Sequence, residues 1–163
     1  MQGLQDSKRK DDSPLYLGKP YILEVSPILG SKNTCELMGD VLFVRLRKKG
    51  EAAKVLEQWY RKEALRVLTE RSRHFASLLQ VVPTEIVVKT QKTRWGSCDR
   101  HNVIRYNWRI VMAPPELLDY LVIHELAHIK EKNHGPNFWA LVESILPDYQ
   151  EKRRALKSFH PSH

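Results

Sequence analysis

The sequence predicts an α+β fold with a long helix, a short and mainly antiparallel sheet, a buried helix and further C-terminal helices. Three observations lead to this fold class. One amphipathic pattern runs from residue 51 to about residue 80, short apolar stretches bounded by turn residues lie on both sides of it, and a nearly continuous apolar segment follows Pro115. With 163 residues and 42% apolar composition, the chain can bury one substantial core.

The composition excludes several classes of protein. The sequence has no run of eighteen apolar residues, and its first 14 residues contain no apolar signal-peptide core. We therefore expect no membrane association and a cytoplasmic location. Cys35 and Cys98 are too few for a disulfide framework, which fits a reducing compartment. Nothing in the sequence indicates an oligomeric state.

The chain is expected to form a single globular domain in three consecutive parts. Residues 1–14 are charged and are expected to be a flexible lead. Residues 15–50 form a β-rich segment, in which residues 20–27 and 40–47 are expected to be antiparallel strands separated by the turn-rich stretches 28–35 and 37–40. Residues 51–160 carry the candidate site described below.

The long helix is expected to pack in the hydrophobic core and to carry no catalytic residue. Its apolar stripe repeats at helical spacing and consists of Leu56, Tyr60, Ala64, Leu68, Phe75 and Leu79. The helix is expected to end before Pro83. Residues 85–98 then form a strand, residues 99–102 a turn and residues 102–112 a returning strand, with Ile104, Tyr106, Trp108 and Ile110 on one face.

Three helices complete the prediction. Pro114 and Pro115 begin the first, and Glu116 and Asp119 fall near its start, where the helix dipole favours acidic residues. A second helix begins at Pro136 and ends before Pro147. A final basic helix runs to about Ser158.

The first of these helices contains the pattern HExxH, formed by His124, Glu125 and His128. Two histidines four residues apart lie on one face of a helix, about 6 Å apart at their roots, and can bind one zinc ion. The intervening glutamate can accept a proton from a water molecule on such an ion. The surrounding residues are apolar, so the helix is expected to be buried, where an unpartnered carboxylate would be costly. A zinc site explains the pattern better than a core helix with incidental histidines.

A catalytic zinc site needs a third protein ligand. His134 lies ten residues after His124, about 15 Å along a continuous helix, so the helix must end and the chain must fold back. We expect this turn at Asn133, which tolerates the left-handed conformation, because the glycine used by metzincins is replaced by Glu131. Glu143 is the competing third ligand, and we favour His134.

The formal charge of +8 is unevenly distributed. Residues 81–113 contain six basic and two acidic residues, whereas residues 114–146 contain two basic and five acidic ones. The excess could attract nucleic acid or phosphorylated substrates, although a solvated surface is the commoner explanation.

The order and spacing of KTRWGSC, NWRIVMAPPELLDYLVIHELAH, NHGPNFW and LPDYQEKRRALK resemble the YgjP-like metallopeptidase family, a compact zincin group related to SprT-like and WLM metalloproteases. The resemblance spans roughly residues 16–157 and implies a zincin-like catalytic domain over residues 51–160. It also implies zinc ligands at His124, His128 and His134, with Glu125 as general base. A pyrophosphatase activity on UTP has also been attributed to this group.

Two function classes therefore remain open. A peptidase would bind an extended polypeptide, and Arg94, Trp95, Gly96 and Tyr149 are candidate substrate-binding residues. Tyr149, Tyr106 and Arg94 are candidates for stabilising an oxyanion. A UTP pyrophosphatase would hold phosphates with the basic residues Lys89, Lys92, Arg94, Arg105 and Arg109. A nucleic-acid-associated protease is a further alternative that rests on net charge alone.

Overall fold

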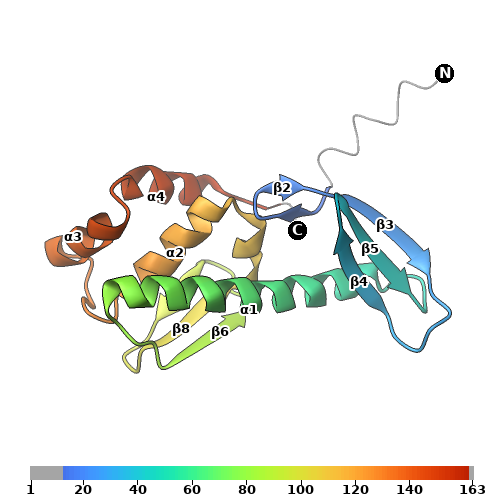
Figure 1. The fold of residues 1–163 in the computed structure, drawn as a ribbon, viewed down its shortest axis with the longest axis horizontal. Helices are drawn as coiled ribbons and strands as arrows, with labels where there is room; N and C mark the ends of the chain where they lie inside the picture. The colour runs from blue at the N-terminus through green and yellow to red at the C-terminus, as the bar shows by residue number, and fades with distance from the viewer. Residues whose placement is uncertain (1–12, 162–163) are drawn as a thin grey trace, which may run out of the picture.

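The structure is a computed structural model that describes residues 13–161 (Figure 1). It confirms a mixed α+β fold of four α-helices, one 3₁₀ helix (η1) and small sheets. The elements are β1 (Leu15–Tyr16), β2 (Lys19–Pro20), β3 (Ile22–Pro27), β4 (Thr34–Met38), β5 (Val41–Leu46), α1 (Ala52–Leu79), β6 (Glu85–Lys89), β7 (Gly96–Cys98), β8 (Val103–Asn107), η1 (Trp108–Met112), α2 (Pro115–Ala127), α3 (Pro136–Ile145) and α4 (Tyr149–Ser158). None of the helices in this part of the chain has the length and apolarity needed to cross a membrane.

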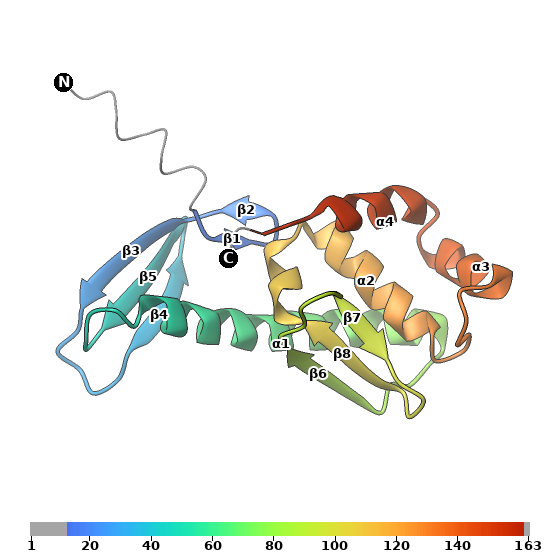
Figure 2. The ribbon, with the colours of Figure 1, turned by 180° about the vertical axis from the view of Figure 1, so that it is seen from behind.

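Helix α1 runs along both halves of the molecule (Figures 1 and 2). The sheet β3–β5 lies at its first end, and α2 and the sheet β6–β8 lie along its second half. Five of the six stripe positions are buried, and Leu56 is partly buried. The helix ends at Gln80, which adopts a left-handed conformation with φ of 56°, three residues before Pro83. The predicted role of this helix in the core is confirmed.

The first sheet differs from the prediction in order and in direction. Its strand order is β3-β5-β4, and β3 runs parallel to β5 while β4 is antiparallel to it. The expected antiparallel pairing of residues 20–27 with residues 40–47 is therefore wrong. Strand β4, residues 34–38, lies mostly within the stretches 28–35 and 37–40 that the sequence predicts as turns. Gly39, with φ of +60°, begins the tight turn that pairs β4 with β5.

The second sheet also corrects the prediction. Its order is β6-β8-β7, with β6 parallel and β7 antiparallel to the central strand. The chain must therefore cross from one edge of the sheet to the other, so the single strand expected over residues 85–98 is interrupted by a loop at residues 90–95. The expected turn at residues 99–102 is present, with Asn102 at φ of 62°.

Asn107 ends β8 and organises both neighbouring segments. Its side-chain oxygen accepts a hydrogen bond from the backbone N–H of Arg109, which caps η1 and ends the strand five residues before the predicted limit. Its side-chain amide donates to the carbonyl oxygens of Gln91 and Arg94, at 3.0 and 3.4 Å, and so holds the crossover loop. The buried residues Trp108 and Ile110 consequently belong to η1 and not to a strand.

The helices of the C-terminal half begin where prolines predicted them to. Pro115 begins α2, Pro136 begins α3, and α4 follows Pro147 and Asp148. Asp119 in α2 forms a two-point ion pair with Arg71 of α1, at 2.9 and 3.0 Å, which ties the two helices together.

The N-terminal strands pack beside the start of α2. Of the expected lead at residues 1–14, residues 1–12 lie outside the described residues, and Pro14 is buried. The turn after β1 places Gly18 at φ of +80°, where its N–H bonds to the carbonyl oxygen of Met112 at 3.1 Å. A side chain at this position would collide with Pro114, since a Cβ atom would lie 2.8 Å from its Cα.

Candidate metal centre

Three imidazoles meet at the C-terminal end of α2. His124 lies in its last turn, His128 directly follows it, and His134 lies in the loop before α3. The Nε2 atom of His134 is 3.2 Å from that of His124 and 2.9 Å from that of His128. Among the described residues these three form the group whose ligand atoms lie close enough, within 4.8 Å of one another, to hold a metal ion.

The turn that returns His134 to the helix is made differently from the prediction. After Ala127 the backbone N–H groups of residues 130 and 131 both bond to the Ala127 carbonyl oxygen, at 3.1 and 3.0 Å. Asn133 does not have a positive φ, so the expected left-handed turn at that residue is wrong. The helix instead unwinds in right-handed turns, which requires no glycine at position 131.

The outer nitrogens of two rings are held by neighbouring oxygens. His128 Nδ1 lies 3.0 Å from the carbonyl oxygen of Glu131, which can only accept, so Nδ1 carries the proton and donates it. His124 Nδ1 lies 3.3 Å from the hydroxyl of Tyr120, one turn earlier in α2. Such contacts orient metal-binding histidines and direct the lone pair of Nε2 inward. The sequence analysis did not identify Tyr120, although its position four residues before His124 places it on the same face of the helix.

The surroundings of His124 and His128 favour the neutral form of both rings. Burial lowers the pKa of His124 to about 3, and the charges of His128, His134 and Arg153 lower it further in the same direction. Burial also lowers the pKa of His128. A metal ligand must be an unprotonated imidazole, and three lone pairs at this separation repel one another unless a cation lies between them. Nitrogens bound tetrahedrally to one zinc-sized ion would lie about 3.4 Å apart, close to the observed distances. The donor set therefore fits a divalent metal.

Glu125 points toward this cluster from the same helix and is 5% exposed. Its Oε1 atom lies 4.0 Å from His124 Nε2. Burial raises its pKa to about 7, and the charge of Arg94 opposes that rise. Gly96 of β7 lies against it, since a Cβ atom at that position would be 3.1 Å from Glu125 Cγ. The absence of a side chain at Gly96 thus allows the sheet to approach the carboxylate closely.

Because its pKa is raised, Glu125 is expected to destabilise the folded, metal-free protein by an amount that increases with pH. The carboxyl group titrates near 4.5 when unfolded and near 7 when folded, so the folded state binds the extra proton between these values and loses stability as the pH rises through them. We expect Glu125→Gln to stabilise the metal-free protein at pH 8 by up to about 3 kcal/mol, and by much less at pH 4.5. Urea unfolding at both pH values measures this difference, and an equal gain at both would contradict it.

Aromatic rings line the surroundings of the cluster. Phe138 of α3 is fully buried and stacks on the His128 ring, with centroids 4.5 Å apart. Trp139 lies parallel to the rings of Tyr149 and His134, at 5.2 and 5.9 Å. A hollow of about 420 Å³ opens beside these rings, and its wall includes His124, His134, Tyr120, Trp95, Trp139, Arg153, Leu156 and Lys157.

The candidate substrate-binding residues lie in different surroundings. Trp95 lines the hollow and packs against Phe159, at 5.8 Å between ring centroids, and Gly96 lies beside Glu125. Arg94 is exposed in the crossover loop, and Tyr149 lines an adjoining hollow. Tyr106, considered for oxyanion stabilisation, is fully buried with its hydroxyl 2.9 Å from that of Ser72, so that expectation is wrong because no substrate can reach it.

The remaining candidates are also placed by the structure. Glu143, the alternative third ligand, is exposed on α3 and is not part of the histidine cluster. Of the residues considered for phosphate binding, Arg105 is paired with Asp99 at 2.8 Å, and Arg109 lies over the Trp108 ring at 4.7 Å. Lys89, Lys92 and Arg94 are exposed and, with Arg105, line a separate hollow of about 330 Å³.

Just over half of the chain is similar in fold to solved structures of metallopeptidase zymogens, including abylysin and jannalysin. The metallopeptidase zymogen abylysin of Pyrococcus abyssi is 22% identical with a TM-score of 0.51, over 56% of this chain and 94% of that one. The metallopeptidase zymogen jannalysin of Methanocaldococcus jannaschii is 24% identical with a TM-score of 0.50, over 55% and 93%. At this level of identity the likeness is one of fold.

A family model described as "YgjP-like, metallopeptidase domain" matches residues 2–159. The chain therefore belongs to the YgjP-like metallopeptidase family, which confirms the resemblance noted in the sequence. No curated protein matches it.

Proposed function

We propose that the protein is a zinc-dependent peptidase that hydrolyses peptide bonds in unfolded or extended polypeptide. The observation that carries this proposal is the convergence of three Nε2 atoms beside a buried carboxylate, in a chain of a metallopeptidase family. His124, His128 and His134 would hold the ion. Imidazole nitrogens suit zinc, and three protein ligands leave a position open for water or substrate.

The roles of the surrounding residues follow from their positions. A bound zinc ion would supply Lewis acidity, which makes a water molecule more acidic and polarises a substrate carbonyl group. Glu125, beside the cluster, accepts the proton of the attacking water and returns it to the leaving amine. Its pKa near 7 before metal binding places it close to the pH of the reaction, and a nearby cation favours its ionised form. Tyr120 and the Glu131 carbonyl hold the histidine rings.

The second sheet offers a place for an extended substrate. Strand β7 lies at one edge of the β6-β8-β7 sheet, and its Gly96 is in contact distance of Glu125. A polypeptide that paired with this edge as an added strand would pass the carboxylate and the histidine cluster. This arrangement supports a peptide as substrate, because an extended peptide can form backbone hydrogen bonds along a strand edge and a compact nucleotide cannot. Arg94, Trp95 and Gly96 border that path.

We expect purified, zinc-loaded protein to cleave reduced and alkylated casein and to leave UTP intact. Parallel assays of one preparation, by mass spectrometry of peptides and by pyrophosphate release from UTP, measure both activities. Hydrolysis of UTP that Glu125→Gln abolishes, with no cleavage of unfolded protein, would refute the peptidase proposal and leave the metal centre standing. In that case Arg94→Ala should weaken UTP binding and magnesium should be required.

A further inference from the structure

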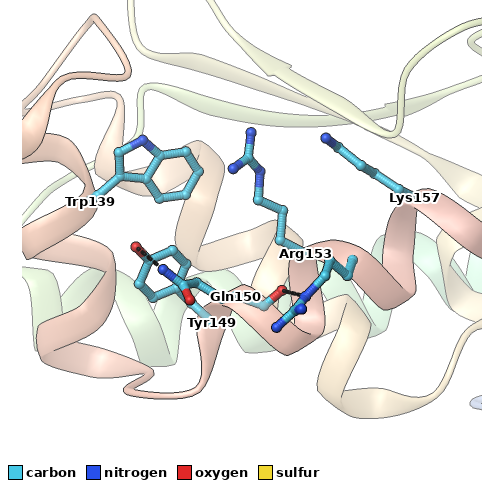
Figure 3. A pocket seen from close by; sticks show the side chains of 6 residues that line it. Trp139, Tyr149, Gln150, Arg153 and Lys157 are labelled. Atoms are coloured by element: carbon cyan, nitrogen blue, oxygen red, sulfur yellow. Dashed lines mark hydrogen bonds between the residues drawn. The ribbon is translucent and has the colours of Figure 1, made fainter.

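A charged trough leads away from the histidine cluster along α4. Two adjoining hollows of about 410 and 420 Å³ share Trp139, Arg153 and Lys157. The larger has His124 and His134 in its wall, and the other continues past Tyr149. Figure 3 shows the side chain of Arg153 between the indole of Trp139 and the side chain of Lys157. A group bound between these two cations would therefore lie next to the metal centre.

Arg153 and Lys157, the two cations common to both hollows, have no acidic partner among the described residues. On α4, Lys152 forms an ion pair with Asp148 at 3.5 Å. Within residues 13–161, neither Arg153 nor Lys157 forms an ion pair. Arg153 and Lys157 lie one turn apart on the same helix, and like charges at this spacing repel each other. An anion bound by both would remove this repulsion.

The guanidinium group of Arg153 is held in place before any ligand arrives. It lies 4.7 Å from the centroid of the Trp139 ring, which is itself stacked on Tyr149. A planar guanidinium fixed by such stacking can donate two parallel hydrogen bonds to a carboxylate, and less conformational entropy is lost when its orientation is already set. Arg154, by contrast, donates to the backbone carbonyl of Gln150 at 3.3 Å.

We propose that Arg153 and Lys157 form a subsite that binds a carboxylate of the substrate next to the scissile bond. This inference rests on the proposed peptidase function and adds a substrate class to it. The carboxylate belongs either to an aspartate or glutamate side chain or to the C-terminus of the substrate. Trp139 and Tyr149 provide a flat apolar surface beside the two cations for the adjoining part of the peptide.

The first test measures the preference itself. Cleavage sites are mapped on reduced and alkylated casein, and the best site is copied into peptides that carry Glu, Gln or Lys at each position flanking the cleaved bond. We expect kcat/KM to be higher for Glu than for Gln at one position by about tenfold or more, as one charge-assisted hydrogen bond provides. A second set compares a free with an amidated C-terminus, and a preference for the free form assigns the subsite to the terminal carboxylate instead.

The second test reverses the charges of the subsite. Arg153→Glu and Lys157→Glu should each abolish the preference for the acidic peptide and favour the Lys peptide, a gain that misfolding cannot produce. Lys62→Glu, at an exposed position of α1, changes the net charge equally and should keep the wild-type preference. Equal rates on all peptides, or a preference unchanged in both subsite variants, would overturn the subsite while peptide cleavage continues. If no unfolded protein is cleaved, the proposed function and the subsite are both overturned. If the wild-type protein instead hydrolyses UTP and Arg153→Glu does not, the trough binds phosphates and the carboxylate subsite is overturned.

Discussion

Replacing Glu125 with glutamine should lower peptide hydrolysis by about a hundredfold or more while the protein retains its metal and its fold. The amide has the same size as the carboxylate and can still form hydrogen bonds, but it cannot accept the proton of the attacking water. Glu125 Oε1 lies 4.0 Å from His124 Nε2, beside the cluster. The substitution therefore removes the base and leaves all three histidines in place. Initial rates on the unfolded substrate, together with metal content by atomic absorption, measure the effect.

Glu143→Gln is the matched control for this experiment. Glu143 is exposed on α3, outside the histidine cluster, so the same loss of one carboxylate there should leave activity within about twofold. Full turnover in Glu125→Gln would remove this residue from the mechanism. Loss of metal in Glu125→Gln would instead show that the carboxylate takes part in holding the ion.

Replacing His134 with alanine should reduce the bound zinc from about one ion per chain to a small fraction. His134 links the other two rings, with Nε2 distances of 3.2 and 2.9 Å, so its removal leaves two protein ligands. Its side chain is exposed and lies in a loop, and we therefore expect the stability of the metal-free protein to change by only about 0.5 kcal/mol. The loss of metal can thus be separated from unfolding.

Glu143→Ala tests the alternative third ligand in the same measurement. We expect this variant to keep the zinc content of the wild type because Glu143 is not part of the cluster. Dialysis against a graded series of chelator concentrations, followed by metal analysis, compares the two variants on one scale. Metal loss in Glu143→Ala and retention in His134→Ala would show that the third ligand had been assigned to the wrong residue.

The sequence predicted the helical part of the site well because its geometry is local. His124, Glu125 and His128 lie within one turn of a helix, and helical periodicity alone places the histidines on one face. The starts of α2, α3 and α4 were predicted for a similar reason, since proline restricts the backbone at its own position. The sequence also predicted that the chain must fold back to bring His134 to the site, because a continuous helix would carry it about 15 Å away. It did not predict which residues make that turn.

The strands were predicted less accurately because their limits depend on distant partners. Residues 85–98 read as one strand, yet β6 and β7 pair with opposite edges of β8, and this pairing forces the loop at residues 90–95. The apolar run after Asn107 likewise continues a strand pattern, but the Asn107 side chain caps η1 at that point. Both outcomes are set by hydrogen bonds between segments that are separated in the sequence.

The sequence by itself determined the helix-bound pair of histidines, the glutamate between them, the long core helix and the family of the chain. Tertiary structure alone decided how the chain turns to bring His134 to that pair, the contact of Gly96 with Glu125, and the position of Arg153 beside the centre. The physical reason is the range of the interactions involved. Periodicity and proline restraint act within a few residues, whereas a packed site is formed by strands, turns and helices whose mutual positions depend on the whole core.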